Sequence, residues 1–132
     1  LNVAHRTGTR RFFNVFQVGV GNSWMVNWMY GLGTTFRLGE RLDLTVQAIS
    51  GLVFSTSAGL SLHGCLTKVL PAVEYRFGRR FTLFGGPSWN LYAFDTSRTV
   101  QPGGIAPYAF YNQVKGRQRL QMWIGATVGI RF

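Results

Sequence analysis

Residues 120–132 read LQMWIGATVGIRF. Apolar side chains occupy every second position of this stretch, namely Leu120, Met122, Ile124, Ala126, Val128, Ile130 and Phe132. The positions between them carry glutamine, glycine, threonine and arginine, with Trp123 as the one large apolar exception. Because successive side chains of a β-strand point to opposite faces of the sheet, this period of two predicts a strand of about 12 residues.

The same period recurs along most of the chain. It predicts strands at residues 12–20, 26–38, 42–54, 68–77 and 81–94, and the tail of a further strand at 1–7. One face of each strand is apolar, and the other carries mainly glycine and amides where a water-facing strand would carry more charge. Such alternation suits a barrel whose outside meets lipid. We therefore predict an all-β fold, an antiparallel up-and-down transmembrane β-barrel, with residues 1–132 as a single barrel domain.

A short motif repeats and locates the tight turns. Residues 36–44 read FRLGERLDL, residues 75–83 read YRFGRRFTL, and residues 5–12, HRTGTRRF, follow the same pattern one residue longer. A glycine at the start of such a loop allows the positive φ of tight hairpins, so we expect three equivalent hairpin tips. Residues 130–132 match the first half of the motif, so they are expected at the same rim.

The connections at the opposite rim differ in length. Residues 21–23 form a tight connection, whereas residues 55–65 and 95–119 are long and rich in Gly, Ser, Thr and Pro. Short turns at one rim and long loops at the other are typical of outer-membrane barrels.

In this loop asymmetry and in its last strand, WIGATVGIRF at 123–132, the chain resembles the small bacterial outer-membrane β-barrel proteins. Members of that family commonly end in an alternating strand with a terminal phenylalanine, which the barrel-assembly machinery reads, so the resemblance makes Phe132 the assembly signal. It implies a location in the bacterial outer membrane, with a periplasmic C-terminus and extracellular long loops. The implied partners are outer-membrane lipid, lipopolysaccharide, the barrel-assembly machinery and other outer-membrane proteins.

The number of strands departs from that family. Its barrels contain an even number of strands, eight or more, whereas six full strands and part of a seventh are predicted here. We expect about eight strands in the complete barrel, with at least one missing from the front. Either residues before Leu1 supply it, or another polypeptide completes the sheet. No charged or apolar leader precedes the first strand, so we expect any signal peptide to have been removed.

Charged residues on the predicted lumen face form one candidate site: Arg37, Asp43, Lys68, Glu74, Arg76 and Arg131. The loop length places Arg37 opposite Asp43 across a hairpin, with Arg76 at the same rim, so that one carboxylate serves two guanidinium groups. We expect a filled, charge-paired interior. The alternative is an ion pathway, but side chains fill the inside of a barrel of about eight strands.

The chain is strongly basic, with a formal net charge of +10, which suggests a polyanion as a neighbour. Four basic residues lie in the predicted outer loop: Arg98, Lys115, Arg117 and Arg119. They are either solvated loop charge or contacts to lipopolysaccharide phosphates. Tyr108, Phe110 and Tyr111 accompany them, as in a platform for single-stranded nucleic acid. Because the charges are spread over both rims and the lumen, and no RNA-binding signature occurs, we expect no nucleic-acid partner.

Catalysis has little support in the sequence. His63 with Ser57, Ser61 or Asp95 would form a triad of the kind that a small outer-membrane lipid-modifying enzyme needs, but no nucleophile motif surrounds these residues. A single cysteine, Cys65, excludes a disulfide framework and a cysteine-based zinc cluster. We expect no enzyme activity, no metal and no cofactor.

The expected role is therefore that of a structural, anchoring or interaction component, alone or as a subunit of a larger outer-membrane complex. Besides the lipid-modifying enzyme, one alternative stays open. A soluble lipocalin-like barrel that binds an apolar ligand would also alternate apolar and polar faces, and dependence on detergent would separate the two.

Overall fold

A computed structural model describes residues 2–9, 11–20, 25–55, 61–78, 81–95 and 108–131. These residues form one antiparallel sheet of eight strands in the order β1-β2-β3-β4-β5-β6-β8-β7. The strands are β1 (Asn2–Gly8), β2 (Phe12–Val20), β3 (Met25–Arg37), β4 (Leu42–Ser55), β5 (Ser61–Phe77), β6 (Phe81–Asp95), β7 (Tyr111–Lys115) and β8 (Gln118–Arg131). In the described ranges, no helix is long and apolar enough to cross a membrane. The all-β, antiparallel, up-and-down part of the prediction is confirmed.

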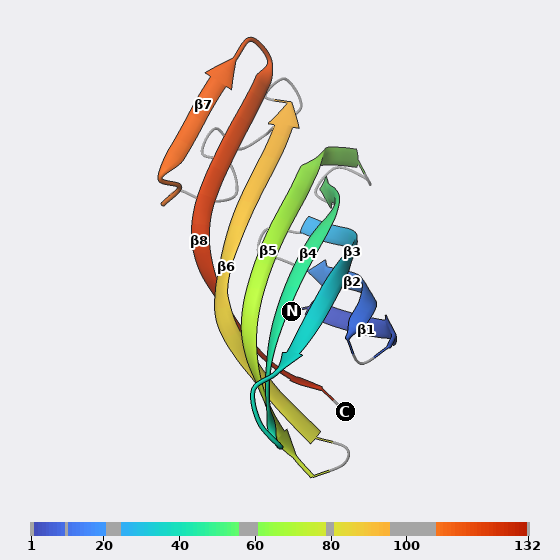
Figure 1. Cartoon of the computed structure of the whole chain (residues 1–132). Coiled ribbons are helices and arrows are strands. Elements are labelled where there is room, and N and C mark those ends of the chain that lie inside the picture. The colour runs from blue at the N-terminus through green and yellow to red at the C-terminus, as the bar shows by residue number, and fades with distance from the viewer. Residues whose placement is uncertain are drawn as a thin grey trace.

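The sheet is strongly curled but not closed (Figure 1). The lower end of β8 passes behind the sheet towards the side on which β1 lies, yet no hydrogen-bonded pairing joins β1 and β8 in the described strands. Glycines on the inside permit this curl. A Cβ added at Gly31 would overlap the carbonyl of Ala48 on β4, and one added at Gly51 would overlap the carbonyl of Trp28 on β3.

The turns at one rim follow the repeated motif only in part. Gly8 and Gly78 adopt positive φ values of 135° and 77°, as predicted. Gly39, by contrast, does not have a positive φ, so the prediction of three equivalent tips is wrong at this turn. There the amides of Leu38 and Gly39 both donate to the carbonyl of Leu42, at 3.0 Å each, and this double hydrogen bond closes the turn without a left-handed glycine.

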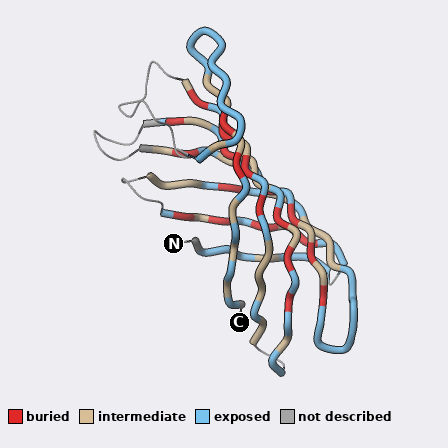
Figure 2. The backbone as a smooth tube through the Cα atoms, turned by 90° about the vertical axis from the view of Figure 1, so that its left-hand side faces the viewer, coloured by how far each residue is buried: buried red, intermediate tan, exposed pale blue. Residues whose placement is uncertain are grey.

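Buried and exposed residues alternate along the strands (Figure 2). The buried side chains lie on the concave face and the exposed ones on the convex face, with the facing that the sequence predicts. Large apolar residues are exposed on the convex face, among them Phe16, Trp28, Leu32, Phe36, Val73, Trp89 and Ile124. The concave face buries polar residues, among them Gln17, Asp43, Thr45, Gln47, Glu74, Ser88, Asn90 and Gln121. It also buries an apolar cluster that includes Phe13, Met29, Ile49, Tyr92, Phe94 and Trp123, so polar and charged side chains fill only part of this face.

Strand β5 begins earlier than predicted, because a β-bulge interrupts the alternation from which the start of the strand was predicted. Its first residue is Ser61 rather than residue 68, so residues 61–65 of the predicted loop at 55–65 belong to β5, and Ser55 belongs to β4. The register with β4 shifts where Val53 pairs with Gly64 and Phe54 pairs with Leu62. The additional residue, His63, is buried, as is Leu66 three positions later, so the period of two is broken there.

Strand β7 lies inside a segment predicted to be loop, 95–119. It pairs with the start of β8 through a turn at Gly116, whose φ is 62°. All residues of β7 are exposed. Since neither face is buried, the strand leaves no alternation of apolar and polar residues in the sequence. The tight connection predicted at 21–23 lies outside the described residues.

Candidate functional site

Two carboxylates are buried on the concave face near the short-turn rim, and each is held by an arginine. Glu74 on β5 is 4% exposed and pairs with Arg6 on β1, with Nη1 and Oε1 3.2 Å apart. The Thr45 hydroxyl donates to the same Oε1 at 3.1 Å. Arg6 also donates from Nη2 to the Thr35 hydroxyl at 2.6 Å, and its guanidinium lies 3.0 Å from the centre of the Phe13 ring. This set of contacts joins β1 to β2, β3, β4 and β5.

Asp43 on β4, which is 5% exposed, forms the second pair, with Arg76 on β5. Arg76 Nε lies 3.3 Å from Asp43 Oδ2, close enough for an ion pair but without the alignment of a hydrogen bond. Arg76 Nη2 donates to Asp43 Oδ1 at 3.4 Å and to the carbonyl of Glu40 at 2.9 Å. Because burying an unpaired charge is costly, these contacts explain how the interior tolerates both carboxylates.

Of the residues in the predicted charge network, the structure brings Asp43, Glu74 and Arg76 into ion pairs on the concave face, but not Arg37. Arg37 is the register partner of Asp43, as predicted. Its side chain is nevertheless exposed, and its Nε donates to the carbonyl of Gly39 at 3.1 Å. Arg37 ends β3, where the carbonyl of Gly39 in the following turn is within its reach. Asp43 therefore does not bridge Arg37 and Arg76 as predicted.

Sequence reasoning missed Arg6, although a signal for it exists. In the repeated motif, the arginine of HRTG at 5–8 takes the place of the arginine in YRFG at 75–78. Arg6 therefore belonged on the lumen face with Arg76. Only the tail of a strand was predicted at residues 1–7, so Arg6 was not assigned to a face.

Lys68 and Arg131 stand apart from these pairs. Lys68 lies on the concave face of β5 and lines a cavity of 740 Å³ together with Gln17, Gln47 and Leu70. It makes no hydrogen bond or ion pair with any residue that the structure describes. Arg131 pairs through its backbone with Thr82, and its side chain lies outside the described part of the structure.

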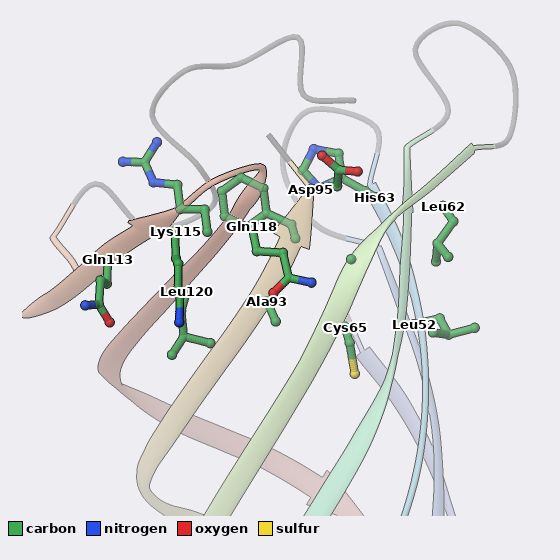
Figure 3. A pocket seen from close by; sticks show the side chains of 13 residues that line it. Leu52, Leu62, His63, Cys65, Ala93, Asp95, Gln113, Lys115, Gln118 and Leu120 are labelled. Carbon is green, nitrogen blue, oxygen red and sulfur yellow. The ribbon is translucent and has the colours of Figure 1, made fainter. Parts of the chain in front are cut away.

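A pocket of 560 Å³ lies at the opposite rim, where β5 begins and β6 ends (Figure 3). Leu52 and Leu62 line one side of it, and Lys115 and Leu120 line the other. Arg119 also lines the pocket. Arg119 Nε donates to Asn112 Oδ1 at 2.7 Å, and its guanidinium lies 6.0 Å from the centre of the Phe94 ring.

Of the four basic residues predicted to contact lipopolysaccharide, the structure brings Lys115 and Arg119 to this pocket. Arg117 is exposed in the turn between β7 and β8. Arg98 and the proposed assembly signal, Phe132, lie outside the described residues. Asp95 lines the same pocket, so its lining is not purely basic.

His63, the centre of the alternative triad, is engaged with aromatic residues. Its Nδ1 hydrogen bonds with the Tyr92 hydroxyl, and its ring stacks against Phe94 with centroids 5.7 Å apart. Ser57 and the side chain of Ser61 lie outside the described part. Within that part, no group of three His, Cys, Asp or Glu residues is arranged to hold a metal ion.

No protein-family model, no curated protein and no solved structure matches this chain. Its function therefore has to follow from its own residues. Three features carry that inference: a curled antiparallel sheet, an apolar convex face, and paired charges buried on the concave face.

Proposed function

We propose that the chain forms most of the wall of an integral outer-membrane β-barrel. The barrel serves as a structural, anchoring or interaction component, alone or within a larger outer-membrane complex, and does not catalyse a reaction. Its convex face contacts lipid, and its concave face is a filled lumen that is stabilised by ion pairs rather than open to ion flow.

The observation that carries this proposal is the inverted polarity of the two faces. Trp28, Leu32 and Phe36 on the convex face of β3 are 58%, 62% and 52% exposed. Asp43 and Glu74 are buried on the concave face. Soluble monomers rarely expose contiguous apolar surface on this scale, and a lipocalin-like barrel in water would carry polar residues at these outward positions. In lipid, the same arrangement places apolar side chains against acyl chains and removes the charges from them.

The height of the apolar band on the convex face matches the thickness of one membrane. Trp28 and Phe36 stand eight positions apart on β3. With a rise of about 3.3 Å per residue and a strand tilt of about 40°, they differ in depth by about 20 Å. Tyr75 and Phe77 gather near the depth of Phe36, and aromatic side chains favour membrane interfaces. The spacing is compatible with an apolar band about 25 Å tall that is flanked by aromatic residues.

The orientation follows from the loops. The short turns and the C-terminus face the periplasm, and the longer connections face the outside of the cell. Lys115, Arg117 and Arg119 then lie at the outer leaflet with Arg98, where they contact lipopolysaccharide phosphates. Phe132 is read by the barrel-assembly machinery. No nucleic acid and no cofactor take part.

Refolding with and without detergent tests the proposal. Expressed without a signal peptide, the chain should form inclusion bodies and refold only in detergent or lipid, to a β-rich species whose migration on gels changes after heating. A monodisperse, folded monomer in detergent-free buffer would favour the soluble lipocalin-like alternative and refute the membrane barrel.

A further inference from the structure

Two strand edges of the sheet are left without a partner in the described part of the chain. Strand β1 pairs with β2 along Asn2–Gly8 and with no other described strand. Strand β8 pairs with β6 along its length, but with β7 only as far as Met122, so its other edge is free from Trp123 to Arg131. In the hydrocarbon core, such edges leave backbone groups without hydrogen bonds, at several kcal/mol each.

Both edges border the same cavity. Val3, Ala4 and Arg6 on β1 line it from one side, and residues 127–130 on β8 line it from the other. Figure 1 shows the lower end of β8 reaching the side of the sheet on which β1 lies. The cavity of 740 Å³ is thus the opening between the two edges of one curled sheet.

The directions of the strands decide what can fill this opening. Each neighbouring pair from β1 through β6 to β8 is antiparallel, so β1 and β8 run in the same direction. Direct pairing of β1 with β8 would therefore be parallel. A second copy of the chain in the same membrane orientation would also present a parallel edge. One strand that runs opposite to both restores an antiparallel sheet with an even number of strands in the wall.

Lys68 indicates what that strand carries on its inner face. Each described carboxylate deep in the lumen is already held by an arginine, Glu74 by Arg6 and Asp43 by Arg76. Among the residues that the structure describes, Lys68 has no such partner, and it faces the cavity beside the amides of Gln17 and Gln47. Lys68 is partly buried, and an ammonium group that loses part of its hydration is stabilised when a charged or hydrogen-bonding group compensates for that loss.

We propose that the opening is filled by one strand that runs antiparallel to both β1 and β8, with apolar residues facing lipid and an aspartate or glutamate facing Lys68. The inference rests on the proposed membrane location. The strand is joined to β1 by a hairpin. A strand antiparallel to β1 would end at the long-loop rim, which is where β1 begins. Among the described strands, the outer edge of β1 has no pairing partner along its whole length, whereas that of β8 has none only from Trp123 to Arg131. A covalent link to β1 raises the effective concentration of the strand.

A designed extension tests this inference. Ten residues that alternate valine with threonine or glycine are fused ahead of Leu1 through an Asn-Gly turn, and a single glutamate is placed in turn at each inward position. Folding is measured in phospholipid vesicles by urea titration. At the best position, glutamate should raise the ratio of folded to unfolded protein about tenfold over glutamine at the same position, as for a hydrogen bond to a charged group. In a Lys68→Met background, the glutamate and glutamine extensions should give the same ratio of folded to unfolded protein.

Three controls separate the alternatives. The same strand fused after Phe132, or added as a free peptide, should stabilise the chain against urea less than the strand fused ahead of β1. Equal stabilisation would overturn the hairpin connection to β1. An equal glutamate effect in Lys68→Met, or none in the unsubstituted chain, would overturn the pairing with Lys68. Efficient disulfide formation between cysteines placed at Ala4 and Gly129 without any extension would overturn the need for a strand. If the chain inserts into vesicles but no extension changes its stability against urea, this inference fails and the proposed function stands.

Discussion

Leu32 lies halfway between Trp28 and Phe36 on the convex face of β3, so an arginine at this position distinguishes a lipid-facing wall from a water-facing one. It stands four positions from each aromatic residue, which is about 10 Å of depth on either side for a tilted strand. Leu32 is therefore at the centre of the proposed apolar band. Its side chain is 62% exposed, so Leu32→Arg creates no cavity and breaks no packed core.

The expected cost is large only in a membrane. At the bilayer midplane, an outward arginine destabilises a barrel by about 2–4 kcal/mol, and near the interface by about 0–1 kcal/mol. Leu38→Arg is the matched control, because Leu38 is 57% exposed and lies beyond the end of β3 at the short-turn rim. In a water-facing sheet, both substitutions should stay within about 0.5 kcal/mol of the unsubstituted chain.

Urea unfolding in phospholipid vesicles, followed by tryptophan fluorescence, measures this difference. Lipid contact predicts that Leu32→Arg lowers the free energy of unfolding by about 1–4 kcal/mol more than the rim substitution does. Equal and small effects of both substitutions would refute the assignment of the convex face to lipid.

Three further outcomes follow from the contacts described above. Glu74→Gln should lower the free energy of unfolding by about 1–3 kcal/mol, measured in the same assay, because it leaves a guanidinium group in the lumen without its carboxylate; an unchanged value would show that the pair does not stabilise the fold. Gly51→Ala should destabilise by about 1–3 kcal/mol because its methyl group overlaps the backbone of β3, whereas Gly39→Ala, which has open space around it, should stay within about 0.5 kcal/mol; equal urea midpoints would contradict the close strand approach. Deleting Phe132 should reduce the amount of chain inserted in the outer membrane and increase its periplasmic degradation, as measured by cell fractionation, and normal insertion would remove its role as assembly signal.

The facing of the strands could be predicted from the sequence because burial in a curled sheet follows the same period of two as the chain. Trp28 is exposed and the next residue, Met29, is fully buried, as the alternation on β3 requires. The prediction failed where that period is interrupted or absent. The bulge at His63 reverses the alternation, and β7 buries neither of its faces.

The partners of the lumen charges were harder to predict than their facing. Asp43 and Arg76 stand on neighbouring strands close to their turns, where local register constrains them. Arg6 and Glu74 are 68 residues apart and meet only because the sheet curls until β1 faces β5 across its concave side. A strand pattern specifies which way a side chain points but not which strand lies opposite. The strand count predicted that the wall is incomplete, but the degree of curling, and hence the position of the opening beside Lys68, could not be predicted from the sequence for the same reason.

Quenching of individual tryptophans by lipid tests the membrane barrel most directly. Trp28 and Trp89 are exposed on the convex face, whereas Trp123 is buried on the concave face with 8% exposure. Variants that keep one of these residues and carry phenylalanine at the other tryptophan positions are refolded in vesicles with brominated phospholipid. The proposed barrel predicts strong quenching of Trp28 and Trp89 and little quenching of Trp123. Quenching of Trp28 and Trp89 by aqueous iodide, with none by brominated lipid, would contradict it.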